Sequence, residues 1–258
     1  MDLGIRGKTA LVTASSGGMG RNIASALAAE GTNLVLFARS ADKLQAAADD
    51  ISREHGVHAS AVPGSMLVAE DVERMVVSAT ARFGGIDIVI LVTGRPPNPI
   101  RTTLDENEQG RWDEAYQNQL WSAINVIRNV VPPMMQRRWG RIVAITSASV
   151  KQPMPHHALS TVFRAGVTAY MKHLANEVAP HGITVNCVAP ALIDTSHRAG
   201  ASAYTEAQAE ARRRMAPMGR MGTQEEMAGV VTFLTSMQAG FVTGSTVNVE
   251  GGMIGTLL

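Results

Sequence analysis

A glycine-rich turn between Thr13 and Gly20 carries the clearest chemical signal in the sequence. Its eight residues, TASSGGMG, include three glycines and two serines, and they separate a short apolar run from a segment with helical spacing. Glycines let a backbone approach a diphosphate closely, and the free N–H groups at a helix N-terminus attract an anion. The turn therefore predicts a dinucleotide site, and a tight strand-to-helix turn without a ligand is the alternative.

The elements that must position this turn alternate between strand and helix along the chain. Apolar and β-branched runs predict seven strands, at residues 10–12, 34–37, 57–62, 87–92, 141–146, 183–188 and 246–249. Helical spacing fills the segments between them, with helices at about 69–83, 112–135, 156–178 and 223–235. We expect Pro132 and Pro133 to bend or end the second of these four helices. The alternation predicts a single doubly wound (Rossmann-type) α/β domain over residues 1–258, with a central seven-stranded parallel sheet.

Composition excludes several classes of function. The chain of 258 residues is long enough for one large α/β domain, and its formal net charge of +1 offers no field for nucleic acid or an acidic membrane. No apolar run approaches the length of a membrane span, and the N-terminus lacks an apolar signal core. The single cysteine, Cys187, excludes an internal disulfide and favours a reducing compartment. We therefore expect a cytoplasmic protein with no nucleic-acid partner, no membrane partner and no metal site.

Four stretches make the chain resemble the short-chain dehydrogenase/reductase family over nearly its whole length. They are TASSGGMG at 13–20, GRIVAITSAS at 140–149, HGITVNCVAPALIDT at 181–195, and the segment from PMGRMG to NVEGG at 217–252. Members of this family bind a nicotinamide dinucleotide, and most interconvert ketones and secondary alcohols. The resemblance implies an NAD(P)(H)-dependent oxidoreductase with a small-molecule carbonyl or hydroxyl substrate, assembled as a homotetramer or a homodimer.

The resemblance also implies which dinucleotide is bound and by which residues. An acid at the end of the second strand would accept the adenosine ribose hydroxyls and repel a 2′-phosphate. This chain has Ala38 there, followed by Arg39, which favours NADP over NAD because a guanidinium can grip a phosphate. Alternatively, Arg39 only covers the adenine. The predicted cofactor-binding residues are Thr13, Ser15, Ser16, Gly18, Met19, Gly20, Arg39, Thr93, Gly94, Pro190, Ile193 and Thr195.

The cofactor pocket departs from the family's pattern at three places. Ala14 replaces the first glycine of the turn, and Ser65 stands where an acid usually meets the adenine. Residues 91–94 read LVTG in place of Asn-Asn-Ala-Gly, so only Thr93 and Gly94 match the usual lining.

The catalytic residues depart further from the pattern. The family's reaction uses a serine on the carbonyl oxygen, a tyrosine that gives or takes the proton, a lysine that lowers the tyrosine pKa, and an asparagine that supports a water chain. Ser147 matches the serine, but Ser160, Arg164 and Gln119 stand where the other three would be. We predict Ser147, Ser160 and Arg164 as the catalytic set. The alternative for Ser147 is a hydroxyl that only caps the loop after its strand. Arginine stays charged and cannot pass a proton as lysine can, but it can reach ribose hydroxyls and stabilise an oxyanion.

A reduction without the tyrosine needs another proton source. His156, His157 and Lys151 lie in the same segment, and a histidine titrates near neutral pH. The alternatives are that the two histidines mark an exposed helix start and that Lys151 is a solvated loop charge.

Two further segments could contact a substrate. Residues 195–221 are predicted to form a substrate lid, of which Ala199 to Met221 is the main part; ordinary core packing is the other reading of its methionines. The loop 95–103 carries Arg95 and Arg101 among prolines. Either arginine could meet a carboxylate, a phosphate or a carrier-bound acyl group, or could be an exposed surface charge.

Two alternatives to an oxidoreductase remain open from the sequence. The first is a non-redox lyase, isomerase or hydrolytic enzyme that reuses the cleft, since the proton relay is lost while a serine and a cation are kept. The second is a cofactor-binding protein without catalysis, which assembles with other chains through the helices at 112–136 and 156–179.

Overall fold

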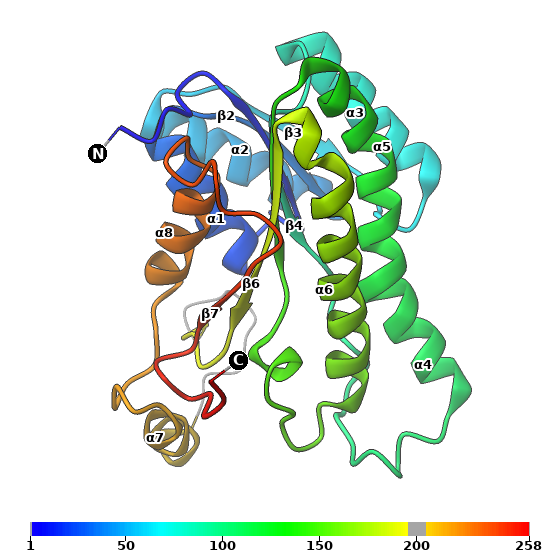
Figure 1. Cartoon of the computed structure of the whole chain (residues 1–258), viewed down its shortest axis with the longest axis vertical. Helices are drawn as coiled ribbons and strands as arrows, with labels where there is room; N and C mark the ends of the chain where they lie inside the picture. The colour runs from blue at the N-terminus through cyan, green and yellow to red at the C-terminus, as the bar shows by residue number, and fades with distance from the viewer. Residues whose placement is uncertain (1, 196–204, 258) are drawn as a thin grey trace.

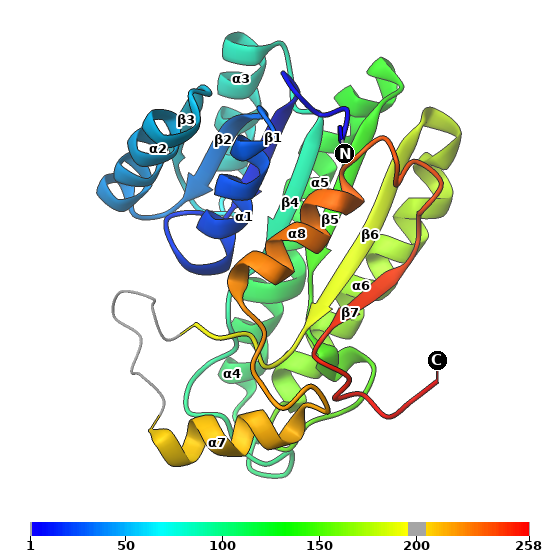
Figure 2. The ribbon, with the colours of Figure 1, turned by 90° about the vertical axis from the view of Figure 1, so that its left-hand side faces the viewer.

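A parallel sheet organises the part of the chain that the computed structural model describes, residues 2–195 and 205–257. Its strands are β1 (Thr9–Thr13), β2 (Asn33–Ala38), β3 (Ala59–Pro63), β4 (Ile88–Val92), β5 (Gly140–Ile145), β6 (Ile183–Pro190) and β7 (Thr246–Val249). The order across the sheet is β3-β2-β1-β4-β5-β6-β7, with every pair parallel (Figure 2). The predicted seven-stranded doubly wound fold is thus confirmed.

Helices cover both faces of the sheet (Figure 1). One face carries α1 (Gly18–Ala29), α2 (Ala41–His55) and α8 (Gln224–Leu234), and the other carries α3 (Ala69–Phe83), α5 (Ser122–Arg137) and α6 (Ala158–Val178). Side chains of one strand alternate between the two resulting cores. Leu11 of β1 lies in the core under α3, α5 and α6. Its neighbours Ala10 and Val12 lie in the core under α1, α2 and α8. This double burial explains why the strands are continuous apolar runs in the sequence.

The strand order reverses between β1 and β4, and ligands of such sheets bind where the carboxyl ends of these strands separate. Thr13 joins the two strands at this point, because its hydroxyl donates to the Val92 carbonyl at 2.8 Å and accepts the Val92 N–H at 2.8 Å. The loops that follow β1, β4, β5 and β6 therefore meet at one edge of the sheet.

The helix expected at 112–135 differs from the observed structure. It begins earlier as α4 (Gln109–Ala115), widens to a π-helix, η1 (Tyr116–Trp121), and continues as α5. Pro132 and Pro133 do not end it, and the helix runs past both to Arg137. Each proline removes one backbone hydrogen bond, but burial of the apolar face on both sides of the pair holds this segment in the helix.

The predicted lid lies partly outside the described residues, since 196–204 are not described. Within the described part, α7 (Glu206–Met215) begins with a capping box from Thr205 and Gln208, and it lies beyond the same end of the sheet as α4 (Figures 1 and 2). Two short 3₁₀ helices, η2 (Ala148–Val150) and η3 (Ala179–His181), flank α6. None of the helices in the described ranges is long and apolar enough to cross a bilayer.

Candidate active site

The turn after β1 fits a diphosphate. α1 begins at Gly18 without an acidic residue in its first turn and without a side-chain cap, so its first N–H groups are left for a ligand. A Cβ on Gly20 would lie 2.6 Å from the Ala14 carbonyl oxygen, so only glycine lets the helix sit this close to the turn. A Cβ on Gly17 would meet nothing within 4 Å, which leaves open space beside the turn. The residues present therefore fit the diphosphate of a dinucleotide.

Two hydroxyls of this turn are already bonded within the protein. Ser15 is buried, donates to the Val12 carbonyl at 2.8 Å and accepts the Phe37 N–H at 3.1 Å. The hydroxyl of Thr13 joins β1 to β4. Thr13 and Ser15 could therefore bind a cofactor only through backbone atoms. Of the other predicted residues of the turn, Ser16, Gly18 and Met19 are partly exposed.

Arg39 lies directly after β2, where the sequence predicts the adenosine end of the cofactor. Its side chain is exposed, and it forms no ion pair with any residue in the described ranges. A guanidinium without an acidic partner at the end of the second strand fits a 2′-phosphate better than a ribose diol.

The π-helix fixes the loop that follows β4. In η1 the Ser122 N–H donates to the Gln117 carbonyl, five residues back, instead of the Asn118 carbonyl as in an α-helix. The Asn118 carbonyl instead accepts the Gly94 N–H at 2.9 Å and the Ser122 hydroxyl at 2.8 Å. A Cβ on Gly94 would approach Asn118 to 3.1 Å, so a small residue is needed there. The predicted pair Thr93 and Gly94 is thereby held at the end of β4.

Ser147 caps the 3₁₀ helix η2 directly after the end of β5. Its Oγ accepts the Ser149 N–H at 3.2 Å and lies 3.0 Å from the Ser149 hydroxyl. Capping of this loop is the alternative role of Ser147 that the sequence leaves open. Because the Ser147 oxygen accepts in this cap, its own proton is left to donate elsewhere. The side chain is partly exposed, so a ligand oxygen can reach it.

Arg164 extends from α6 to the ends of β4 and β5. Its Nη1 lies 3.1 Å from the Ile145 carbonyl oxygen and 3.4 Å from the Thr146 carbonyl oxygen. The same Nη1 is 3.4 Å from the Thr93 hydroxyl, and Nη2 donates to the Gly94 carbonyl at 3.2 Å. All these acceptors are neutral. Burial, together with the positive charge of Arg95, lowers the pKa of Arg164 to about 10. At pH 7 about one molecule in a thousand would be neutral, so Arg164 acts as a fixed cation.

Ser160 lies one turn before Arg164 on α6 and is buried. The two residues are four positions apart and share a helix face. His157 occupies the N-cap position of α6, and its Nδ1 lies 2.7 Å from the Pro155 carbonyl. A carbonyl only accepts, so the proton is on Nδ1 and the Nε2 of a neutral His157 has a free lone pair. His156 is exposed with a φ of 60°, and Lys151 is partly exposed.

The remaining predicted cofactor residues follow β6. Pro190 ends this strand, and Ile193 forms an isolated parallel bridge with Gly222. Thr195 is the last described residue before 196–204 and is partly exposed. These three residues lie beside the carboxyl end of β6, at the same sheet edge as Ser147.

The side chain of Gln119 is buried without hydrogen-bond partners among the described residues, which the sequence could not indicate. It is fully buried in η1, and neither atom of its amide has a hydrogen-bond partner among the described residues. A buried amide without a partner costs about 1–3 kcal/mol, so such groups are usually bonded to an ordered water or a ligand. Gln119 therefore has unused hydrogen-bonding capacity beside the Asn118 carbonyl that holds Gly94.

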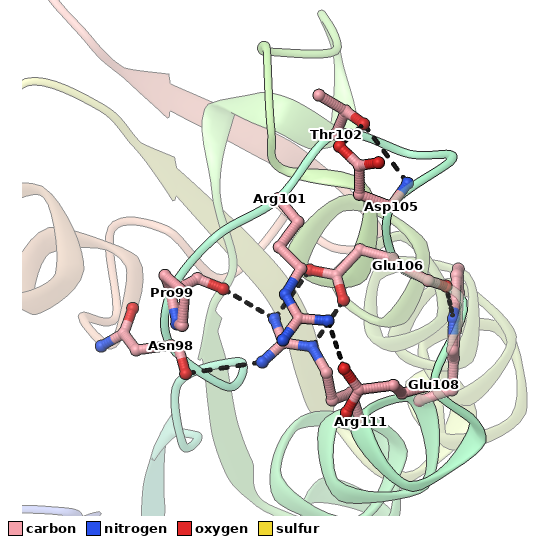
Figure 3. Close-up of polar contacts among 9 residues, drawn as sticks. Asn98, Pro99, Arg101, Thr102, Asp105, Glu106, Glu108 and Arg111 are labelled. Atoms are coloured by element: carbon pink, nitrogen blue, oxygen red, sulfur yellow. Dashed lines mark hydrogen bonds and ion pairs between the residues drawn. The ribbon is translucent and has the colours of Figure 1, made fainter.

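A buried ion pair, also absent from the sequence prediction, closes the loop between β4 and α4 (Figure 3). Arg111 donates from Nε and Nη2 to the two carboxylate oxygens of Glu106 at 2.7 and 2.8 Å. Its Nη2 also donates to the Pro99 carbonyl at 2.7 Å, and Trp112 Nε1 donates to the Glu106 carbonyl at 2.7 Å. One guanidinium thus ties the middle of the loop, at Pro99, to its end at Glu106. In the ranges 2–195 and 205–257, no cluster of three His, Cys, Asp or Glu could hold a metal ion.

Comparisons with known proteins agree with this geometry. The family model described as enoyl-(acyl carrier protein) reductase matches residues 13–254. The 3-oxoacyl-[acyl-carrier-protein] reductase FabG of Aquifex aeolicus is 33% identical over 255 residues, which cover 98% of this chain and 100% of that protein. Nodulation protein G of Rhizobium sp. (strain N33) is 32% identical over 249 residues, covering 96% of this chain and 98% of that protein.

Solved structures show the same likeness. L-sorbose reductase from Gluconobacter frateurii, in complex with NADPH and L-sorbose, superposes with a TM-score of 0.87 at 31% identity over the whole of both chains. A putative short-chain alcohol dehydrogenase from Sinorhizobium meliloti superposes with a TM-score of 0.90 at 26% identity, also over the whole of both chains. The chain therefore belongs to the short-chain dehydrogenase/reductase family, a family of oxidoreductases.

Proposed function

We propose that this protein is an NADP(H)-dependent oxidoreductase that interconverts a ketone and a secondary alcohol, with Ser147 and Arg164 acting on the reacting oxygen. The observation that carries the proposal is their convergence at the end of β5. Arg164 bonds to the carbonyls of Ile145 and Thr146, and Ser147 is the next residue along the chain. This end of β5 adjoins the β1–β4 crevice, where the turn at 13–20 would hold the cofactor.

NADPH, when bound, supplies a hydride to the carbonyl carbon, and all other steps fall to this chain's residues. In the proposed reduction, the Ser147 hydroxyl donates a hydrogen bond to the carbonyl oxygen. Arg164 stabilises the negative charge that develops on that oxygen. Preorganised donors of this kind contribute about 10²–10³ in rate each, and orientation of the reactants contributes more. The binding residues proposed for NADP are the predicted set from Thr13 to Thr195, with Arg39 at the 2′-phosphate.

The alkoxide must still gain a proton. Arg164 stays charged near neutral pH, and a serine such as Ser160 does not ionise there, so neither is an efficient acid. His157 can accept a proton at Nε2 and release it again, which makes it a candidate relay together with water. Loss of a positioned general acid costs about 10²–10⁴ in rate, so the proposed enzyme is slower than a relative with the tyrosine.

The test is NADPH oxidation with a panel of ketones, followed by identification of the alcohol. Wild type should consume NADPH and form one alcohol per NADPH, and Ser147→Ala should lower kcat/KM by about 10²–10³. Ser149→Ala is the comparison variant: it keeps the Ser147 hydroxyl and removes one donor to it, so its effect on kcat/KM should be smaller. Equal rates for wild type and Ser147→Ala would remove Ser147 from the mechanism. Turnover of a substrate without any change in NADPH absorbance would favour the non-redox alternative.

The proposal includes a homotetramer or homodimer in the cytoplasm. Large apolar side chains lie exposed on the described surface, including Val162 on α6 and Phe233 on α8, and Phe241 is fully exposed before β7. Exposed apolar residues on these elements suit contacts between copies of the chain. A chain with one buried cysteine suits a reducing compartment. Light scattering tests the assembly, and a monomer at micromolar concentration would contradict it.

A further inference from the structure

The arginines at the edge of the sheet beside β4 differ in whether an acid neutralises them. Arg111 is paired with Glu106, and Arg101 is paired with Glu108 at 2.6 Å (Figure 3). Arg164 and Arg95 form no ion pair with any residue in the described ranges. Glu106 and Glu108 thus each neutralise one arginine, whereas Arg164 and Arg95 have no ion-pair partner among the described residues.

These two unpaired cations lie close together. Arg164 Nη2 bonds to the carbonyl of Gly94, and Arg95 is the next residue. Each guanidinium raises the free energy of the other, an effect already seen in the lowered pKa of Arg164. Like charges held together by the fold are a cost to the empty protein, and a bound anion would remove that cost.

The hydrogen bonds of Arg164 to the described residues leave two of its five N–H groups unused. Nη1 is surrounded by three acceptors, and Nη2 donates to one carbonyl. A guanidinium has five N–H groups, so Nε–H and the second hydrogen of Nη2 remain. The exposed guanidinium of Arg95 is therefore the one left to bind a carboxylate, while these two donors of Arg164 face the reacting oxygen in the proposed reduction. Arg164 as a whole residue is partly exposed although its guanidinium is buried, and Ser147 lies beside the same strand end.

We propose that the substrate of this reductase carries a carboxylate, which the exposed guanidinium of Arg95 binds while Arg164 acts on the reacting oxygen. The substrate class is thus an oxo acid or hydroxy acid rather than a neutral ketone. The reduction in this inference rests on the proposed function, whereas the carboxylate-binding site does not. Phosphate esters match a guanidinium as well, so the test includes them as a competing outcome.

The experiment compares oxo acids with their methyl esters, which keep the ketone and lose the charge. The probes are pyruvate, acetoacetate and levulinate, each with its ester, and dihydroxyacetone phosphate with dihydroxyacetone. Wild type should prefer at least one acid over its ester by about tenfold or more in kcat/KM, the usual size of one charge-assisted contact. Arg95→Gln should remove most of this preference, because the variant no longer distinguishes the carboxylate from its ester. Arg101→Gln is the matched control, since Glu108 already neutralises that charge.

Equal rates for all acids and esters would overturn the inference while leaving the proposed function intact. A preference for only the phosphate ester would overturn the assignment to a carboxylate. If no probe is reduced, calorimetry decides whether the carboxylate site exists, by measuring the binding of the three acids to the enzyme in the presence of NADP⁺. Acid binding that Arg95→Gln weakens and Arg101→Gln does not would support the anion site and reject the reduction. Absence of binding would reject the site.

Discussion

The Glu106–Arg111 pair gives the sharpest prediction about how the site is held in place. Glu106→Gln keeps the size of the side chain and removes its charge, which leaves the Arg111 guanidinium buried without an acid. Removing one partner of a buried ion pair typically costs about 3–5 kcal/mol. The pair here is covered by one loop rather than by a deep core, so we expect the lower end, about 3 kcal/mol for Glu106→Gln. For a chain of this size that loss corresponds to a fall in Tm of about 6–12 °C.

Urea unfolding at pH 7 measures this loss, and Arg101→Gln is the internal control. Arg101 and Glu108 form an ion pair on the same loop, but Glu108 is 60% exposed, and exposed pairs contribute about 0–1 kcal/mol. Adding Arg111→Met to Glu106→Gln should recover part of the loss, because the uncompensated charge is then gone. If Glu106→Gln cost no more than Arg101→Gln, the pair would not hold the loop, and this reasoning would be refuted.

The same pair predicts a pH dependence. The hydrogen bonds from Arg111 hold the pKa of Glu106 below its ordinary value of 4.5, despite an opposing effect of burial. A carboxyl whose folded pKa is lowered stabilises the fold above its unfolded pKa, and this contribution is lost as the pH falls through the folded value. The difference between wild type and Glu106→Gln should therefore be constant from pH 8 to about 5 and shrink below pH 4.

Three other changes test separate parts of the structure. Arg39→Ala should lower the preference for NADPH over NADH by about 10–100-fold in kcat/KM, and an unchanged preference would remove Arg39 from the 2′-phosphate site. Ala14→Gly should raise the free energy of unfolding by about 0.5–1 kcal/mol, because Ala14 holds a φ of 50°. In contrast, Gly20→Ala should destabilise the turn and weaken NADPH binding, which calorimetry measures. Burial raises the pKa of Cys187 to about 12, so iodoacetamide at pH 8 should modify the folded protein at least 10³-fold more slowly than the unfolded chain.

Much of the fold could be predicted from the sequence because its strands are buried on both faces. The run at 87–92 is observed as β4 from Ile88 to Val92, and the helix predicted at 69–83 is observed as α3 with the same bounds. Continuous β-branched runs and one apolar stripe per helix fix these elements locally. The π-helix could not be predicted, since Tyr116–Trp121 has no local signal that separates it from an α-helix. The path through Pro132 and Pro133 depends on tertiary burial rather than on propensity.

The sequence predicts positions for the candidate site, whose roles stay predictions, but it does not predict the network of contacts among them. Motif spacing pointed to Ser147 and Arg164, and the structure places both at the end of β5. The sequence cannot tell which acid neutralises which arginine, because that depends on how the loop 95–108 folds back over α4. The commitment of the Ser15 hydroxyl to the backbone is likewise a consequence of packing between β1 and β2.

The most direct measurement is transfer of deuterium from the C4 position of deuterated NADPH. With a ketone that the enzyme accepts, one deuterium should appear at the carbinol carbon of the alcohol for each NADPH consumed, and Ser147→Ala should slow this transfer. Consumption of the ketone with no deuterium in the product would contradict the hydride transfer on which the account is built.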